Sequence, residues 1–209
     1  ILRGGADKAA EAGFSIGGGH TIIDDVPKYG LVVTGIVSVA KLVRNSTARP
    51  GDVLYLTKPI GTGILVSAHR GKSFFHRPPP LDEAIRWMTT LNRDAAKAMV
   101  EAGASAATDI TGYGLIGHLL EMCEGSGTGA EIRVSAVPVL TGAREELARG
   151  SRPEGTVRNV ETFRNRIRLS VPESELTLMC DAQTSGGLLI AIPPERAAVL
   201  EMKLAEGGL

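Results

Sequence analysis

The chain has 209 residues, of which 43% are hydrophobic and 22% charged, and its 23 basic and 23 acidic side chains give a formal net charge of zero. This composition is typical of a globular protein with a sizeable core, and it argues against disorder and against a basic nucleic-acid-binding surface. No apolar run reaches the roughly 18 residues that a membrane-spanning helix needs, so we expect no membrane segment. Two cysteines, Cys123 and Cys180, are too few for a disulfide framework, and we expect buried, unreactive thiols in a cytoplasmic protein.

The first 51 residues are predicted to be the end of one domain. Residues 7–13 look like the last turns of a helix that ends at Gly13, and because the sequence has no initiator Met, we expect a fragment of a longer protein. Residues 14–16 and the β-branched run 31–37 are typical of strands that close a sheet. The polar stretch after them contains a Pro-Gly turn at residues 50–51, which predicts a second domain over residues 52–209.

The second domain opens with a predicted strand at residues 53–57, followed by a helix that ends near His69. Apolar residues then recur at three-and-four spacing from Leu81 to Ala102, with Gly103 just beyond. This spacing predicts one helix over the whole stretch, with Trp87 at the edge of its apolar face.

The remaining elements alternate between helix and strand. We predict a helix from about Gly112 to Gly125, a strand at 132–134, a helix at 143–148, an irregular polar stretch through Arg168, a buried strand at 188–192, and a final helix that begins at the prolines 193–194. This alternation places the chain in the α/β or α+β class.

Three glycine-containing clusters are candidates for chemistry, because backbone N–H groups at such turns can face an anion. The first is residues 17–21, in which Gly18 and Gly19 would allow close backbone approach while His20 and Thr21 could donate hydrogen bonds to phosphate oxygens. It lacks the spacing of a P-loop or a dinucleotide fingerprint, so a tight turn without a ligand is an equal alternative.

The second cluster, residues 107–114, places Asp109 between two threonines ahead of a predicted helix. Its carboxylate could cap that helix, or it could bind Mg²⁺, a hard cation that prefers carboxylate oxygen. One aspartate is not a metal site, and Asp24 and Asp25 are open candidates for further ligands.

The third cluster, residues 181–187, joins polar side chains to paired glycines before the buried strand. Such a turn must approach another backbone or a ligand, and a hydrogen-bonded turn is the slightly favoured interpretation. His118 lies off the apolar stripe of its helix, which indicates a surface or packing role. From the residues alone, the prediction ends at a phosphate- and metal-binding protein.

The order and wording of these clusters resemble the selenophosphate synthetase (selenide, water dikinase) family over nearly the whole chain. The motifs that carry the resemblance are Gly18-Gly19-His20-Thr21, Lys28-Tyr29-Gly30, Val33-Thr34-Gly35, Asn45-Ser46, Arg49-Pro50-Gly51-Asp52, Thr57-Lys58-Pro59, Ala107 to Leu115, Gly117-His118-Leu119 and Gln183 to Leu189. The resemblance implies the two-layer α+β fold of aminoimidazole ribonucleotide synthetase, with residues 1–51 ending the ATP-binding N-terminal domain and residues 52–209 forming the C-terminal domain. It implies a homodimer that converts ATP, selenide and water to selenophosphate, AMP and phosphate with Mg²⁺.

By the same resemblance, Gly18, Gly19, His20 and Thr21 would contact ATP and Asp109 would bind the metal. The family's nucleophilic cysteine or selenocysteine, its partner lysine and its other metal-binding aspartates belong to a segment that this sequence does not contain. We therefore expect these 209 residues to be inactive alone, with no catalytic residue among them.

The sequence departs from the family pattern at several positions, and alternatives remain. The departures are Ser38-Val39-Ala40, Thr47, Tyr113, Ala182 and the segment from Phe74 to Pro80. Another enzyme of the fold, such as thiamine-monophosphate kinase, would not keep the second and third clusters together. A non-catalytic ATP-binding or regulatory module is the alternative from a different class.

Overall fold

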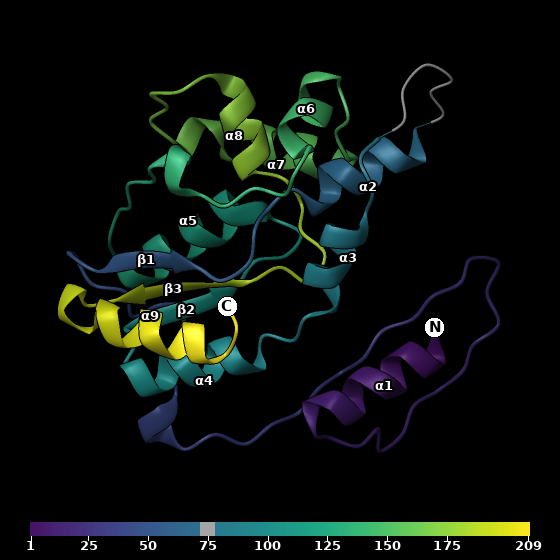
Figure 1. Ribbon diagram of the computed structural model, residues 1–209, viewed down its shortest axis with the longest axis horizontal. Coiled ribbons are helices and arrows are strands. Elements are labelled where there is room, and N and C mark those ends of the chain that lie inside the picture. Colours follow the sequence, from purple (N-terminus) through teal and green to yellow (C-terminus); the bar gives the residue numbers. More distant parts are fainter. Residues whose placement is uncertain (72–77) are drawn as a thin grey trace. The chain divides into compact units, whose positions relative to one another are not determined.

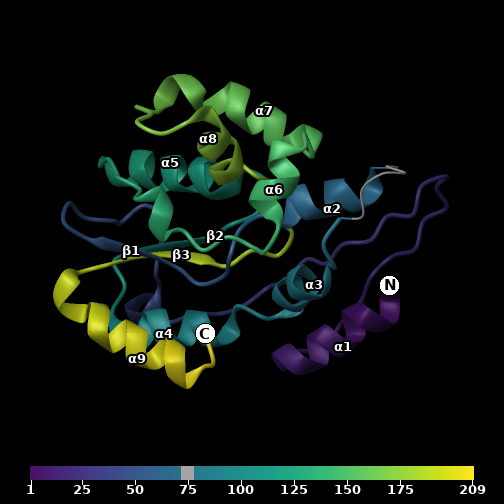
Figure 2. The ribbon, with the colours of Figure 1, turned by 45° about the horizontal axis from the view of Figure 1, so that its top comes forward.

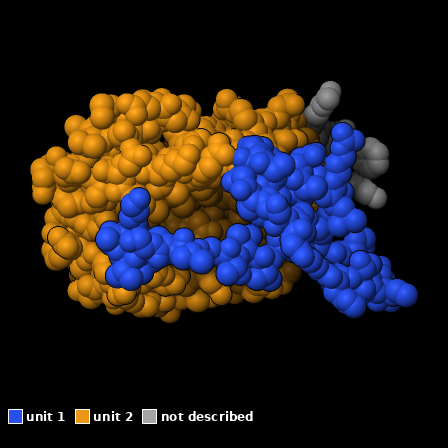
Figure 3. Space-filling model, turned by 90° about the horizontal axis from the view of Figure 1, so that it is seen from below, with its two compact units in different colours: residues 1–42 blue, residues 43–209 orange. Residues whose placement is uncertain are grey.

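A computed structural model describes residues 1–71 and 78–209, and the chain divides into two compact units, residues 1–42 and 43–209 (Figure 3). The domain boundary predicted between residues 51 and 52 stays a prediction. Most of the unusual segment from Phe74 to Pro80 lies outside the described residues.

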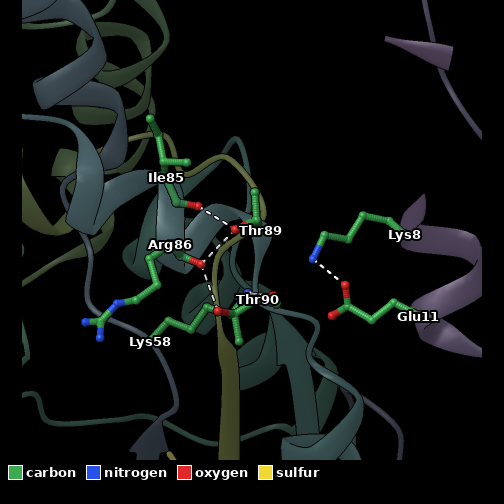
Figure 4. Close-up of polar contacts among 7 residues, drawn as sticks. All are labelled: Lys8, Glu11, Lys58, Ile85, Arg86, Thr89 and Thr90. Carbon is green, nitrogen blue, oxygen red and sulfur yellow. Dashed lines mark hydrogen bonds and ion pairs between the residues drawn. The ribbon is translucent and has the colours of Figure 1, made fainter. Parts of the chain in front are cut away.

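Unit 1 contains helix α1 (Leu2–Ala12), which ends as predicted at Gly13, in the left-handed conformation at φ 82°. The Lys8 ammonium lies 2.6 Å from the Glu11 carboxylate one turn along the helix (Figure 4). A short 3₁₀ helix, η1 (Val39–Lys41), lies near the end of the unit.

The strands predicted at residues 14–16 and 31–37 are wrong, because no strand forms anywhere in residues 1–42. A strand exists only when a neighbour takes its backbone hydrogen bonds, and unit 1 supplies no such neighbour to these extended segments. Their apolar side chains are accordingly exposed, with Val32 and Ile36 at 98% and 103% of full exposure.

Unit 2 is built on a three-stranded antiparallel sheet, as far as the structure describes the chain. The strands are β1 (Val53–Leu56), β2 (Ala106–Asp109) and β3 (Leu188–Ile192), in the order β1-β3-β2 (Figure 1). The central strand β3 coincides with the predicted buried strand, and all five of its residues are buried. β1 is confirmed to within one residue.

Helices cover both faces of this sheet (Figures 1 and 2). α4 and α9 pack on one face with Ile190 and Ile192, whereas α5 packs on the other with Leu189 and Ala191. Alternate residues of one strand thus enter opposite cores, as the period of a strand requires. The helices are α2 (Thr62–Arg70), α3 (Asp82–Thr89), α4 (Arg93–Ala102), α5 (Gly114–Ser126), α6 (Ala143–Ala148), α7 (Glu154–Phe163), α8 (Glu173–Met179) and α9 (Ala197–Glu206). The predicted α+β class is confirmed.

The single helix predicted from Leu81 to Ala102 is wrong: α3 ends at Thr89, and α4 begins at Arg93. The hydroxyls of Thr89 and Thr90 donate to the carbonyls of Ile85 and Arg86, and the backbone of Thr90 is extended (Figure 4). Such hydroxyl bonds compete with the helix ladder, so the chain leaves the helix there.

Two further predictions need correction. Residues 132–134 do not form a strand, and Val134–Ala136 form the 3₁₀ helix η2, because that segment pairs with no strand of the sheet. The stretch through Arg168 is not irregular, since it contains α7 and the 3₁₀ helix η3 (Arg164–Arg166). The inward residues of α7 include Thr156 and Asn159, whose polarity hid the helical spacing of its buried face.

Candidate functional site

Two loops meet where β2 ends and β3 begins, and they carry most of the second and third sequence clusters. One follows β2 (residues 110–113) and the other precedes β3 (residues 181–187), because antiparallel β2 and β3 place those ends together. The Ile110 N–H donates to the Gly187 carbonyl at 2.9 Å, and the Gln183 N–H donates to the Thr111 carbonyl at 3.0 Å. The structure therefore joins two clusters that were separate in the sequence.

The paired glycines permit this approach. A Cβ on Gly186 would lie 2.2 Å from the Ile110 carbonyl oxygen, and one on Gly187 would lie 2.5 Å from the Lys58 nitrogen. Both distances are far below van der Waals contact with backbone atoms that cannot move aside cheaply. The predicted approach of this turn to another backbone is confirmed.

Asp181 and Gln183 cap the N-terminus of α2. The Gln183 Oε1 accepts from the N–H groups of Gly61 and Thr62 at 3.0 and 3.2 Å. The Asp181 Oδ2 accepts from those of Gly63 and Ile64 at 3.0 and 3.3 Å. These are the N–H groups that a helix otherwise leaves free for an anion, so the protein's own side chains occupy this helix end.

The Asp181 carboxylate is fully buried, and burial raises its pKa to about 6. Hydrogen bonds from Thr156, Gln183 and the start of α2 act in the opposite direction, yet the loss of hydration outweighs them. Asp181 therefore links α2, α7 and the loop before β3 as a structural carboxylate and not as an exposed ligand.

Asp109 does not cap the helix that follows it. Its side chain is exposed at the end of β2, whereas α5 begins at Gly114, with Tyr113 in the N-cap position and no side-chain cap. The helix-cap alternative is wrong. An exposed carboxylate is chemically suited to be one ligand of a hard cation.

No group of three His, Cys, Asp or Glu side chains able to hold a metal ion occurs within residues 1–71 and 78–209. Asp109 thus fits a Mg²⁺ site as a single donor. Asp24 belongs to unit 1, where an ion pair with Lys28 lowers its pKa. Metal binding by Asp109 stays a prediction.

Two polar side chains support the loop after β2. His118 is buried, and its Nε2 lies 3.1 Å from the Thr111 Oγ1. Asn159 of α7 donates to the carbonyls of Gly112 and Cys180 at 2.8 and 3.0 Å. The packing role predicted for His118 is confirmed and the surface role is wrong. No sequence signal pointed to Asn159, since its partners lie far away along the chain.

The first glycine cluster lies in unit 1. Gly17, Gly18 and Gly19, like His20 and Thr21, are exposed in a segment without regular secondary structure. None of the three glycines has a positive φ, and a Cβ on any of them would have no neighbour within 4 Å. They do not form a tight turn, and their contact with ATP stays a prediction.

Neither cysteine has the surroundings of a nucleophile. Cys180 is fully buried, and burial raises its pKa to about 12. Cys123 is only partly buried, contrary to prediction, and burial raises its pKa as well. A thiol whose pKa is raised supplies little thiolate at neutral pH.

A pocket of about 1020 Å³ lies elsewhere in unit 2, between β1, α5 and residues 128–138. Its walls include the core side chains Leu54, Leu115 and Met122. The pocket is therefore continuous with the hydrophobic core, and the loops that carry Asp109 and the paired glycines do not line it.

Comparison with known proteins shows the family of the chain. Residues 49–208 match the family model described as AIR synthase related protein, C-terminal domain. The chain belongs to this family. Among curated relatives, it is 47% identical to a selenide, water dikinase of Caldanaerobacter subterraneus subsp. tengcongensis over 98% of its length, and 48% identical to one of Geobacter metallireducens over 94%. It spans 59% and 57% of the lengths of those relatives, and their names confirm the resemblance seen in the motifs.

Solved structures of the AIR synthase fold confirm the fold class. The hydrogenase maturation protein HypE in complex with ATP superposes with a TM-score of 0.54 at 22% identity, covering 81% of this chain and 42% of HypE. Thiamine-monophosphate kinase from Stenotrophomonas maltophilia K279a gives 0.54 at 19% identity, covering 82% of this chain and 48% of the kinase. In the part of the chain that the structure describes, no helix combines the length and apolarity needed to cross a membrane.

Proposed function

We propose that the full-length protein that contains this chain is a selenide, water dikinase, which converts ATP, selenide and water to selenophosphate, AMP and phosphate. The observation that carries the proposal is the 47% identity to a protein of that name over 98% of the chain. The joined loops after β2 and before β3 add support, because the motifs that distinguish this family from other enzymes of the fold form one structural unit.

Asp109 is the proposed Mg²⁺ ligand within these residues. Bound Mg²⁺ would neutralise charge on the phosphates of the nucleotide. The chain's own contribution is to hold the Asp109 carboxylate at the end of a strand that is hydrogen-bonded to β3, with Asp109 opposite Leu188. Gly18, Gly19, His20 and Thr21 are the proposed ATP contacts, and their hydrogen-bond donors would offset negative charge on the phosphates.

The remaining parts of the proposal concern the whole protein. We expect a cytoplasmic homodimer, and we expect the 209 residues alone to be inactive, because the chain spans only about three fifths of its relatives. AMP release that depends on both ATP and selenide from the isolated 209 residues would contradict this expectation.

The test is to measure AMP and selenophosphate formation by the full-length protein and by its Asp109→Asn variant. We expect the substitution to lower Mg²⁺-dependent turnover by about 100-fold, because the amide removes the charge that holds the cation. Asp94→Asn is the matched control, since the Asp94 carboxylate lies on α4 in exposed ion pairs with Arg93 and Lys97, and it should leave turnover unchanged.

The outcome also separates the alternatives. An intact protein that binds ATP but forms no selenophosphate would move the function to another phosphoryl transfer or to a non-catalytic ATP-binding or regulatory module. Normal turnover by Asp109→Asn would remove Asp109 from the metal site while leaving the reaction assignment in place.

A further inference from the structure

β1 is an edge strand of the sheet, and one side of its backbone is open (Figure 1). The Thr57 N–H, just past the strand, donates to the Leu188 carbonyl at 3.1 Å. Every second residue of an antiparallel strand faces the same neighbour, so the N–H and C=O groups of Leu54 and Leu56 point away from β3. Within the described residues, no backbone hydrogen bond from outside the sheet reaches either leucine. Such an open edge is a template for a further strand.

The pocket of about 1020 Å³ lies against this open edge. β1 forms one wall, and residues from the segment 128–138 form another. All four residues of β1 are only partly buried, whereas all five residues of β3 are buried. The open edge therefore leaves the apolar side chains of β1 incompletely covered.

A parallel bridge joins the far end of the segment 128–138 to the chain beyond β1. Ile60 pairs with Val139 in this bridge. The Ile60 N–H donates to the Pro138 carbonyl at 3.0 Å, and the Leu140 N–H donates to the Ile60 carbonyl at 2.9 Å. A parallel ladder has this pattern, in which one residue bonds to both neighbours of the residue opposite. Continued toward the N-terminus, the same ladder brings residues 131–135 alongside β1.

The apolar side chains of residues 131–135 fix the register of this pairing. Ile132 and Val134 pack against the same hydrophobic cluster as the two leucines of β1. Opposite residues of parallel strands point to the same face of a sheet, so Ile132 belongs opposite Leu54. By the same rule, Val134 belongs opposite Leu56. Arg133, which is exposed, then faces away from the apolar cluster.

This register leaves one surplus residue between the two pairs. The chain advances five residues from Val134 to Val139. It advances only four from Leu56 to Ile60 on the opposite side. A β-bulge absorbs one extra residue in one of two paired strands. η2 begins at Val134 and lies within this stretch, so the turn that interrupts the segment lies where the bulge is needed.

We propose that residues 131–135, here called the strap, close onto β1 as a fourth, parallel strand and cover the pocket. The arrangement described above is the open form. Closing pairs the backbone groups of the open edge and buries apolar side chains of both segments, and each effect favours the closed form. The closed form contains the strand that the sequence predicted at residues 132–134. Closing involves no residue of the proposed reaction.

Four backbone hydrogen bonds define the closed form. The Leu54 N–H donates to the Glu131 carbonyl, and the Leu54 carbonyl accepts from the Arg133 N–H. The Leu56 N–H donates to the Arg133 carbonyl, and the Leu56 carbonyl accepts from the Ser135 N–H. Proline at position 133 removes one of these donors. The open form tolerates it, because η2 uses only the carbonyl of Arg133, and the φ of Arg133, −83°, is close to that of proline.

The experiment is amide hydrogen exchange, followed residue by residue by NMR, in the 209-residue chain and in its Arg133→Pro variant. We expect the wild-type Leu54 and Leu56 amides to exchange about 100-fold more slowly than unstructured amides, because the closed strap protects them. Arg133→Pro should return both amides to nearly the unstructured rate. Arg133→Ala is the matched control, since it removes the same side chain but keeps the N–H, and it should leave the protection unchanged.

The Ile190 amide is the internal reference, because Ile190 pairs with Tyr55 in the sheet and should stay protected in every variant. Loss of protection at Ile190 in Arg133→Pro would show that the variant does not fold, and Ser135→Pro with Ser135→Ala then takes its place. Wild-type Leu54 and Leu56 amides that exchange at the unstructured rate would show that the strap does not close. Protection that survives the proline would come from burial without pairing, and it would overturn the inference.

Discussion

The buried carboxylate of Asp181 makes stability depend on pH. Its pKa is about 6 in the folded protein and near its ordinary value of 3.8 when unfolding exposes it. Because the folded state binds the proton more tightly, the contribution of Asp181 to stability is fully present below about pH 4 and is lost as pH rises through about 6. A difference of about two pKa units corresponds to roughly 3 kcal/mol of unfolding free energy.

We therefore expect Asp181→Asn to remove this pH dependence. The asparagine oxygen can accept from the start of α2, and its amide can donate to the Thr156 Oγ1, which donates to Asp181 in the wild type, so the contacts to α2 and α7 are kept without a charge. Denaturant unfolding of wild type and variant between pH 4 and pH 7 measures the effect. A variant whose stability falls across this range as steeply as that of the wild type would contradict the assignment.

At the residue scale, the sequence predicted that a close backbone contact would form, but it did not predict which residues would form it. The paired glycines Gly186 and Gly187 correctly indicated close backbone approach, because few other requirements place two glycines before a buried strand. The same letters could not identify Ile110 as the neighbour or predict that Gln183 caps α2. Those partners are fixed by tertiary packing between segments far apart in the sequence.

At the element scale, the helix α5 depends on a glycine in its first turn, Gly117. A Cβ on Gly117 would lie 2.6 Å from the Tyr113 Cβ and 2.7 Å from the Phe163 ring, which packs edge-on against Tyr113. Neither neighbour can move without disturbing the contact between α5 and α7. This glycine therefore sets how closely the two helices approach.

We expect Gly117→Ala to lower stability by roughly 1–3 kcal/mol, the usual cost of overpacking. Gly155→Ala is the matched control, because Gly155 is also helical but a Cβ there would meet Ala182 at an ordinary 3.7 Å. The control should unfold at the same temperature as wild type or slightly higher, since alanine favours the helix. Thermal unfolding followed by circular dichroism compares the two, and equal midpoints would contradict the packing argument.

Helices and strands were predictable where a short residue pattern between turn residues was enough to define them. β3 and α6 have the predicted bounds because each is a short patterned run between turn residues. The stripe from Leu81 to Ala102 misled because it is the sum of two separate apolar faces: Ala84 of α3 packs in one core cluster, whereas Ala95 and Ala98 of α4 pack in the other. The run 31–37 has the composition of a strand, but composition cannot supply the neighbouring strand.

At the scale of the whole molecule, the two units differ in how they are stabilised. Every described strand and both hydrophobic clusters lie within residues 43–209. Residues 1–42 combine α1 and the short η1 with extended segments whose apolar side chains are largely exposed. Stability of the chain should therefore come from unit 2.

We expect residues 43–209, produced without residues 1–42, to unfold cooperatively with a midpoint within a few degrees of that of the 209-residue chain. The physical reason is that the deletion removes no strand and no member of either core cluster. Near-ultraviolet circular dichroism and thermal unfolding test this. Loss of fixed tertiary packing in the shorter chain would show that unit 2 is not an independent folding unit.

The strand order has a consequence for biosynthesis. β1 and β2 each pair with β3, which is the last strand along the chain. Val53 can therefore pair with Ile192, and Ala106 with Ala191, only after β3 has emerged from the ribosome. Until then the nascent chain carries two strands with no partner and leaves their apolar faces uncovered. The sheet should therefore form late in synthesis. Because its contacts join segments far apart in the sequence, we expect slow folding and a nascent chain that benefits from chaperones.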